Sequence, residues 1–239
     1  MSTTPNRYYT SWEGFWTSLS DSPVEVLWDV GSEQVAAQDL PRFAAHMDPK
    51  LPLIDVGCGN GTQTLFLASR FPEVFGVDVA PGAIEKARQS NAAANITYSV
   101  LDLLQRSQAE ALHSKIGDAN LYLRTVLMQF LPPDRPTVVE SLTTLLGTKG
   151  ALYMQEYPPA AEQYYKSLFE RQGIPPGFER VLRHGITPGV LSPADLEVLF
   201  PKNAFEVLGA GDCRMQTRIP LADGGFAQPP AIFLVLRRR

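Results

Sequence analysis

Short apolar runs alternate with amphipathic stretches along most of the chain. Leu53, Ile54 and Val56 open the series, and their nearly unbroken apolar character is typical of a parallel strand covered on both faces. The stretches between the first five runs favour helices, so we predict strands that alternate with helices. A turn-like 223–225 separates the last two runs and favours a short antiparallel hairpin. The predicted strands are 53–56, 74–79, 96–103, 118–125, 151–156, 205–208 and 231–236.

The segment before these strands is rich in aromatic residues and holds all three tryptophans of the chain. Trp12, Phe15 and Trp16 lie at i, i+3 and i+4 on one face of a helix, for which Ser11 is a possible N-cap. Such a face can pack on the core or close over a site and exclude water, and we expect both roles. The residues expected to touch a ligand are Tyr9, Trp12 and Trp16.

A second helix is predicted in the N-terminal region, from a cap at Ser32 to about Met47, with Pro41 as a possible kink or break. Together these helices define an N-terminal helical lid or cap over 1–48, ahead of a larger unit over 49–239.

A glycine-rich turn follows the first strand. Gly57, Gly59 and Gly61 follow one another with single-residue spacing, and a helix begins at about Thr62. Glycine allows a sharp turn and close approach to a ligand, while the helix N-terminus directs free N–H groups at the turn. The dinucleotide fingerprint is G-x-G-x-x-G, whereas the spacing here is G-x-G-x-G with Asp55 inside the strand end. This arrangement favours a ligand that carries an ammonium group and no pyrophosphate.

Two further acidic residues end the next two predicted strands. Asp78 lies near the ~20-residue offset at which a carboxylate can accept both ribose hydroxyl hydrogens. Asp102 ends the third predicted strand. Over about 51–156, the glycine turn and the two acids resemble the cofactor region of class I S-adenosylmethionine-dependent methyltransferases.

The resemblance implies a Rossmann-like, doubly wound α/β fold. Its seven-stranded sheet would be mostly parallel with an antiparallel last strand, and helices would cover both faces. It also implies S-adenosylmethionine as cofactor, S-adenosylhomocysteine as product, and adenine recognition by Asp102. A metal is not expected, because Arg124 stands where an acidic ligand would be needed. The expected cofactor-binding residues are Asp55, Gly57, Cys58, Gly59, Asn60, Gly61, Asp78, Val79, Asp102, Leu103 and Arg124.

The stretch 157–200 interrupts the strand series. It combines an aromatic stripe around Tyr164 and Tyr165 with a Pro/Gly-rich part, and Ser192 caps a further helix. We interpret it as a cover on the substrate side, with a simple surface excursion as the alternative.

Three residues are candidates for a general base. They are His184, Glu156 and Tyr157, although His184 could equally be an exposed loop histidine. Gln129 and Arg124 are candidates for orienting an acceptor. The expected substrate-binding residues are Tyr9, Trp12, Trp16, Gln129, Tyr157 and His184.

Composition limits the partners. The chain has 239 residues, 44% of them hydrophobic and 19% charged, as in an ordinary globular protein. A net charge of −4 argues against a nucleic-acid surface, and no apolar run approaches the ~20 residues of a membrane span. The two cysteines, Cys58 and Cys213, form no disulfide framework, and no secretory signal is visible, so we expect a cytoplasmic protein. Monomer and homodimer both remain open.

The leading hypothesis is transfer of a methyl group to an O, N or S atom of a small, partly aromatic or apolar acceptor by in-line displacement. The alternatives are methylation of RNA or protein, a non-catalytic S-adenosylmethionine-binding partner or sensor, and a nicotinamide-dependent enzyme.

Overall fold

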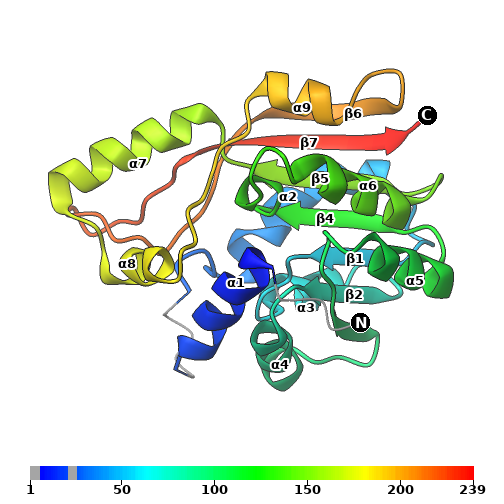
Figure 1. Cartoon of the computed structure of the whole chain (residues 1–239), viewed down its shortest axis with the longest axis horizontal. Helices are drawn as coiled ribbons and strands as arrows, with labels where there is room; N and C mark the ends of the chain where they lie inside the picture. Colours follow the sequence, from blue (N-terminus) through cyan, green and yellow to red (C-terminus); the bar gives the residue numbers. More distant parts are fainter. Residues whose placement is uncertain (1–5, 21–25) are drawn as a thin grey trace.

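A seven-stranded sheet lies at the centre of the protein, whose computed structural model describes residues 6–20 and 26–239 (Figure 1). The strand order is β3-β2-β1-β4-β5-β7-β6. Strands β1 to β5 pair in parallel, whereas β7 is antiparallel to both of its neighbours and β6 forms the edge. The strands are β1 (Leu53–Val56), β2 (Val74–Asp78), β3 (Ile96–Val100), β4 (Asn120–Arg124), β5 (Ala151–Glu156), β6 (Phe205–Arg214) and β7 (Pro230–Arg238).

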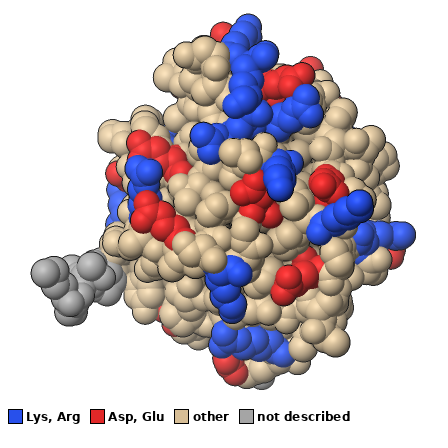
Figure 2. Space-filling model, turned by 90° about the vertical axis from the view of Figure 1, so that its right-hand side faces the viewer, with Lys and Arg blue, Asp and Glu red and all other residues tan. Residues whose placement is uncertain are grey.

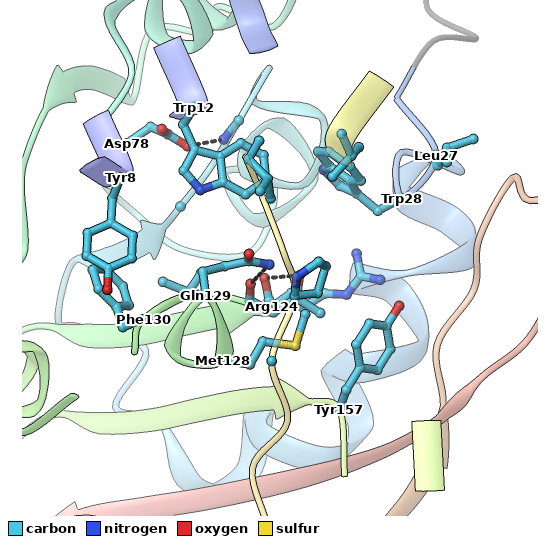
Figure 3. Close-up of a pocket in the computed structure, with 18 of the residues that line it drawn as sticks. Tyr8, Trp12, Leu27, Trp28, Asp78, Arg124, Met128, Gln129, Phe130 and Tyr157 are labelled. Atoms are coloured by element: carbon cyan, nitrogen blue, oxygen red, sulfur yellow. Dashed lines mark hydrogen bonds between the residues drawn. The ribbon is translucent and has the colours of Figure 1, made fainter. Parts of the chain in front are cut away.

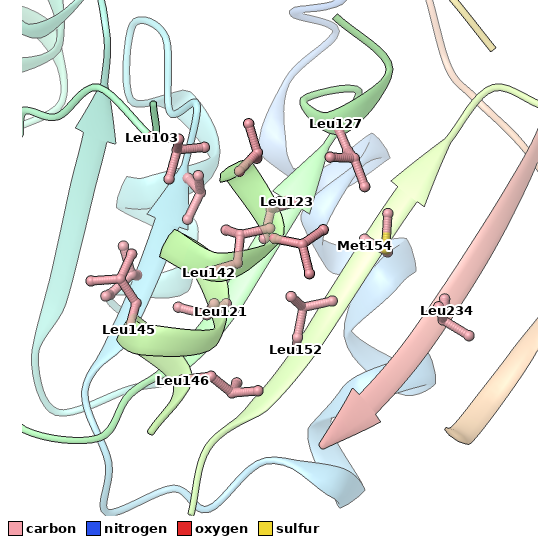
Figure 4. Packing of buried hydrophobic residues seen from close by; sticks show 14 of the residues in the cluster. Leu103, Leu121, Leu123, Leu127, Leu142, Leu145, Leu146, Leu152, Met154 and Leu234 are labelled. Atoms are coloured by element: carbon pink, nitrogen blue, oxygen red, sulfur yellow. The ribbon is translucent and has the colours of Figure 1, made fainter. Parts of the chain in front are cut away.

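Helices cover both faces of the sheet because alternate side chains of each strand point to opposite faces. Ile54 packs in the cluster that includes α5 and α6, whereas Leu53 packs in the cluster that includes α2 and α3. Figure 4 shows the first cluster, with leucines of α6 against β4 and β5. The α-helices are α1 (Arg7–Ser18), α2 (Ala36–Phe43), α3 (Thr62–Leu67), α4 (Pro81–Ser90), α5 (Arg106–Ile116), α6 (Arg135–Leu146), α7 (Pro159–Gln172), α8 (Pro176–Arg183) and α9 (Pro193–Leu199).

The predicted doubly wound, mostly parallel fold is confirmed, and the differences concern element ends. The third strand ends at Val100, and Asp102 lies in the loop beyond it. Helix α1 is capped by Asn6, whose Oδ1 accepts a hydrogen bond from the Tyr9 N–H, and not by Ser11. The helix predicted over 32–47 is split into η2 (Ser32–Gln34), α2 and η3 (Ala44–His46). Residues 1–5 and 21–25 of the predicted lid lie outside the described part of the chain.

The connection between the last two strands is also longer than predicted. Strand β6 continues to Arg214 and β7 begins at Pro230, so 215–229 forms an excursion and not a tight turn. The sequence 209–214 lacks the β-branched and aromatic residues that mark strands, but pairing with β7 supplies its hydrogen bonds. As a result, 215–229 lies near α7 and α8, beyond the carboxyl ends of the parallel strands (Figure 1).

The surface carries both signs of charge. Lys and Arg are interspersed with Asp and Glu over the face seen in Figure 2. Across 6–20 and 26–239, no helix is both long enough and apolar enough to cross a bilayer.

Candidate active site

A cavity of about 670 Å³ lies at the carboxyl ends of the parallel strands, where ligands bind in open α/β sheets (Figure 3). One side is formed by the glycine turn and the ends of β1, β2 and β4. The other side is formed by α1, 27–29, α7, α8 and 186–190, with Thr217 and Ile219 from the β6–β7 connection.

The glycine turn runs so close to its neighbours that side chains would not fit. Gly57 and Gly59 have φ of 71° and 55°, in the left-handed region. A Cβ on Gly57 would lie 2.6 Å from Val126 Cγ2, and one on Gly59 would lie 2.9 Å from Trp16 Cζ2. The turn is therefore held between the segment after β4 and the N-terminal helix.

Asp78 ties this turn to the next helix. Its Oδ2 accepts a hydrogen bond from the Gly59 N–H and its Oδ1 accepts one from the Ala80 N–H, both at 3.0 Å. Desolvation nevertheless raises the pKa of this carboxyl to about 6. The side chain lines the cavity, so lone pairs remain available to a ligand (Figure 3).

The other two predicted acids also line the cavity. Asp55 is buried at 3% exposure and accepts a hydrogen bond from Thr64 Oγ1 at 2.6 Å, and desolvation raises its pKa to about 7. Asp102 accepts hydrogen bonds from Asn6 Nδ2 at 2.6 Å and from the Leu104 N–H at 2.9 Å, and burial raises its pKa. Asn6, the N-cap of α1, thus donates directly to an acid in the loop after β3.

Sequence reasoning missed a third anchor of the glycine turn. The buried Asp29 Oδ2 accepts hydrogen bonds from Asn60 Nδ2 at 2.6 Å and Thr62 Oγ1 at 3.0 Å. Leu27 and Trp28, beside it, also line the cavity. The segment 27–29 has no helical or strand periodicity, so its aromatic character was the one sequence signal of a role in the site.

The aromatic wall comes mainly from α1. Trp12 lies edge-on to Trp28, with ring centroids 5.7 Å apart. Tyr8, and not Tyr9, lines the cavity. The Tyr8 hydroxyl donates to Asp134 Oδ2 at 2.6 Å and accepts from the Leu131 N–H at 2.8 Å, which holds this turn of the helix against the start of α6.

The three candidate bases are all engaged elsewhere. Glu156 is buried at 1% exposure, lies outside the cavity lining and accepts hydrogen bonds from the N–H groups of 126, 127 and 128. The Tyr157 hydroxyl lies 2.9 Å from that of Tyr165, and burial raises its pKa. His184 also lies outside the lining and packs on α1, with its ring 6.2 Å from that of Phe15.

The end of β4 and the segment after it place two polar side chains in the cavity. Arg124 Nε donates to Gln155 Oε1, and Gln129 Nε2 donates to the Thr125 carbonyl, both at 3.1 Å. Thr125 has φ of 53°, and it is the one non-glycine residue with positive φ in the described part of the chain. The predicted site residues that line the cavity are Asp55, Gly57, Cys58, Gly59, Asn60, Asp78, Val79, Asp102, Leu103, Trp12, Trp16, Arg124, Gln129 and Tyr157, and those outside are Gly61, Tyr9, Glu156 and His184.

Comparison with known proteins agrees with this geometry. A model of the methyltransferase domain family matches residues 53–150. A solved structure described as a SAM-dependent methyltransferase from Anabaena variabilis is 42% identical, covers 96% of this chain and 94% of that chain, and has a TM-score of 0.91. The chain belongs to the S-adenosylmethionine-dependent methyltransferases.

Curated relatives match shorter stretches. A trans-aconitate 2-methyltransferase of Methylobacterium radiotolerans is 30% identical over 52% of this chain and 47% of its own length. A Bacillus cereus protein named as an uncharacterized RNA methyltransferase is 42% identical over 44% of this chain and 22% of its own length. The chain thus spans about half, or less, of the curated relatives it matches.

The residues of this methyltransferase fit its cofactor. The carboxylates of Asp55 and Asp78 would hold the ammonium group and the ribose hydroxyls, and Asp102 would accept from the adenine amino group. The glycine turn leaves room for close approach, and Val79 and Leu103 add apolar walls. Among the described residues, no group of three or more His, Cys, Asp and Glu side chains is placed to hold a metal ion.

Proposed function

We propose that this methyltransferase acts on a small molecule with a partly aromatic or apolar body. The observation that carries the proposal is the shape of the site. The glycine turn opens into a cavity walled by α1, α7 and α8, and most of this wall is apolar. A walled cavity suits a small acceptor, whereas a polynucleotide needs an extended groove.

S-adenosylmethionine supplies a methyl group that its sulfonium has already activated. The task of the chain is therefore to bind the acceptor, align it and exclude water. In this proposal the 1–48 segment acts as a lid and 157–200 as a cover on the acceptor side. Contacts that support the lid role are those of Asn6 with Asp102 and of Trp16 with the glycine turn.

Relatives point to two kinds of acceptor. The name trans-aconitate 2-methyltransferase supports a small molecule, whereas the RNA methyltransferase name supports the alternative. The net charge of −4 and the mixed charges in Figure 2 favour the small molecule. We further propose a cytoplasmic location and a monomer or homodimer.

A label-tracking assay tests the proposal. The protein is incubated with methyl-labelled S-adenosylmethionine and a host extract, and small molecules are then separated from protein and nucleic acid. We expect the label in the small-molecule fraction. Label in RNA or protein would refute the acceptor class, and cofactor binding without any transfer would favour a non-catalytic module.

A further inference from the structure

Arg124 is a half-buried cation that forms no direct ion pair among the described residues, although its charge acts on the buried Asp55 carboxyl. Its Nε donates to Gln155 Oε1 at 3.1 Å, and among the described residues no carboxylate forms an ion pair with it. The guanidinium has five N–H donors, and a neutral amide engages only one of them. Its remaining N–H donors are thus available to a ligand in the cavity.

A buried network holds the guanidinium in place. Gln155 is 3% exposed, and its Nε2 donates to Cys213 Sγ at 3.2 Å and to Asp39 Oδ1 at 3.5 Å. Because the amide nitrogen faces a carboxylate, the amide oxygen is left to accept from Arg124. Asp39 is itself held by Tyr122 at 2.9 Å and Arg42 at 2.6 Å. Gln155 is therefore a positioning residue for Arg124.

The hydrogen bond to Gln155 directs the Arg124 side chain toward β5 and away from the glycine turn, and we infer that this part of the cavity holds the acceptor. Gln155 belongs to β5, whereas the glycine turn follows β1, on the opposite side of β4. In the view of Figure 3, Arg124 lies away from Asp78, and Met128, Tyr157 and Trp28 line the same cavity. A cation beside apolar side chains gains little solvation, so an anionic ligand is favoured there.

None of the three predicted positions presents an ionised base to the acceptor. Glu156 and His184 lie outside the cavity lining. Tyr157 lines the cavity, but its hydroxyl pairs with that of Tyr165 and burial raises its pKa, so it is a neutral phenol. An acceptor that attacks without losing a proton must already be ionised or carry a free lone pair at neutral pH. A carboxylate satisfies both this requirement and the charge of Arg124.

We propose that the acceptor is a carboxylic acid, bound as its carboxylate by Arg124 and converted to a methyl ester. This inference rests on the proposed function. A carboxylate oxygen donates a lone pair to the methyl carbon and forms the new O–C bond. The S–C bond breaks, and its electron pair stays on sulfur, which leaves the neutral thioether of S-adenosylhomocysteine. One positive and one negative charge disappear together, and no proton moves.

The binding test compares acids with neutral amides of the same shape. Protein saturated with S-adenosylhomocysteine is titrated calorimetrically with cinnamate and cinnamamide, and with octanoate and octanamide. At least one acid should bind on the order of tenfold or more tightly than its amide. Arg124→Gln should abolish this preference, whereas Arg106→Gln, the same change on the surface of α5, should preserve it.

Several outcomes would overturn the carboxylate assignment. These are equal affinity for acid and amide, no binding of either acid, and a preference that survives Arg124→Gln. Loss of S-adenosylhomocysteine affinity in Arg124→Gln would also overturn it, because Arg124 would then serve the cofactor. Failure of the unaltered protein to bind S-adenosylhomocysteine would instead refute the proposed function.

The labelled product offers a second, chemical test. Mild alkali hydrolyses a methyl ester and releases the label as methanol, whereas methyl groups on amines, thioethers and ether oxygens stay attached. We expect labelled methanol from the product of the extract assay. Label retained on the acceptor after alkali would overturn the proposal, while leaving small-molecule methylation intact.

Discussion

Replacing Glu156 with Gln tests whether this buried acid supports the site or takes part in chemistry. Its Oε1 accepts hydrogen bonds from the N–H groups of Val126 and Leu127, at 3.2 and 2.9 Å, and its Oε2 accepts one from Met128 at 3.2 Å. These bonds shape the turn between Arg124 and Gln129, both of which line the cavity. We expect Glu156→Gln to weaken this turn and to leave the chemical step largely intact.

The expected loss of unfolding free energy in Glu156→Gln follows from the hydrogen bonds that the substitution removes. A Gln oxygen at the Oε1 position keeps two of the three hydrogen bonds, but its NH₂ group then faces the Met128 N–H. One buried donor is left unsatisfied, which costs about 1–3 kcal/mol of unfolding free energy. For a chain of this size, the melting temperature should fall by about 2–4 °C per kcal/mol.

The free energy of unfolding should also depend on pH, in a direction that can be measured. Desolvation raises the folded-state pKa of Glu156 from 4.5 to about 7. The stability contributed by this group is therefore complete below about pH 4.5 and is lost as the pH rises through about 7. Gln does not titrate, so the destabilisation by Glu156→Gln should be larger near pH 5 than near pH 8.

Urea or thermal unfolding at both pH values, together with the methyl-transfer rate, measures these effects. Glu156→Ala serves as a stronger variant, because it removes all three acceptor contacts and should destabilise more. The reasoning would be refuted by a transfer rate reduced ~10²–10⁴-fold with an unchanged melting temperature, since that is the signature of a lost general base.

Three further substitutions probe the two sides of the site. Asp78→Asn should weaken S-adenosylhomocysteine binding on the order of tenfold at pH 8. Because the pKa of Asp78 is about 6, affinity of the unaltered protein should fall as the pH drops through 6, and calorimetry should show a smaller fall in the variant, where Asp55, with a pKa of about 7, still titrates. Gly59→Ala introduces a Cβ 2.9 Å from Trp16 at φ of 55°, so binding should weaken by about 1–3 kcal/mol and tryptophan fluorescence should change; unaltered affinity would contradict the close packing. His184→Ala should change the transfer rate by no more than about twofold, and a much larger loss would restore His184 as a base.

The cofactor side could be predicted from the sequence because its signals are local. The apolar run 53–56 is followed at once by the glycine turn, and Asp78 ends the next strand, so parallel pairing brings them together. The strand ends of a parallel sheet share one edge, and no long-range contact has to be guessed. The differences on this side are that Asp102 lies beyond β3, that Gly61 lies outside the cavity lining, and that Asp29 anchors the turn from a segment without periodicity.

The acceptor side could be predicted only in part, because its residues meet through tertiary contacts. Trp12, Trp16, Gln129 and Tyr157 line the cavity as predicted, whereas Tyr9 and His184 do not. Tyr8 faces the cavity in place of Tyr9 because its hydroxyl reaches Asp134, which lies 126 positions further along the chain. Glu156 follows an apolar strand as a catalytic acid would, but its carboxylate is consumed by backbone N–H groups. Neither periodicity nor spacing carries this information.

The contribution to folding stability does not explain why a polar network lies behind Arg124. Asp39, Gln155 and Arg124 form a continuous polar path from α2, along the face of the sheet that α2 covers, to the cavity. Apolar side chains of similar volume would pack in the same space without any desolvation cost. The arrangement gains a cation whose position is fixed and which forms no direct ion pair among the described residues. Such a cation has a use only if an anion enters the cavity, and that is the physical reason to seek the acceptor among carboxylic acids.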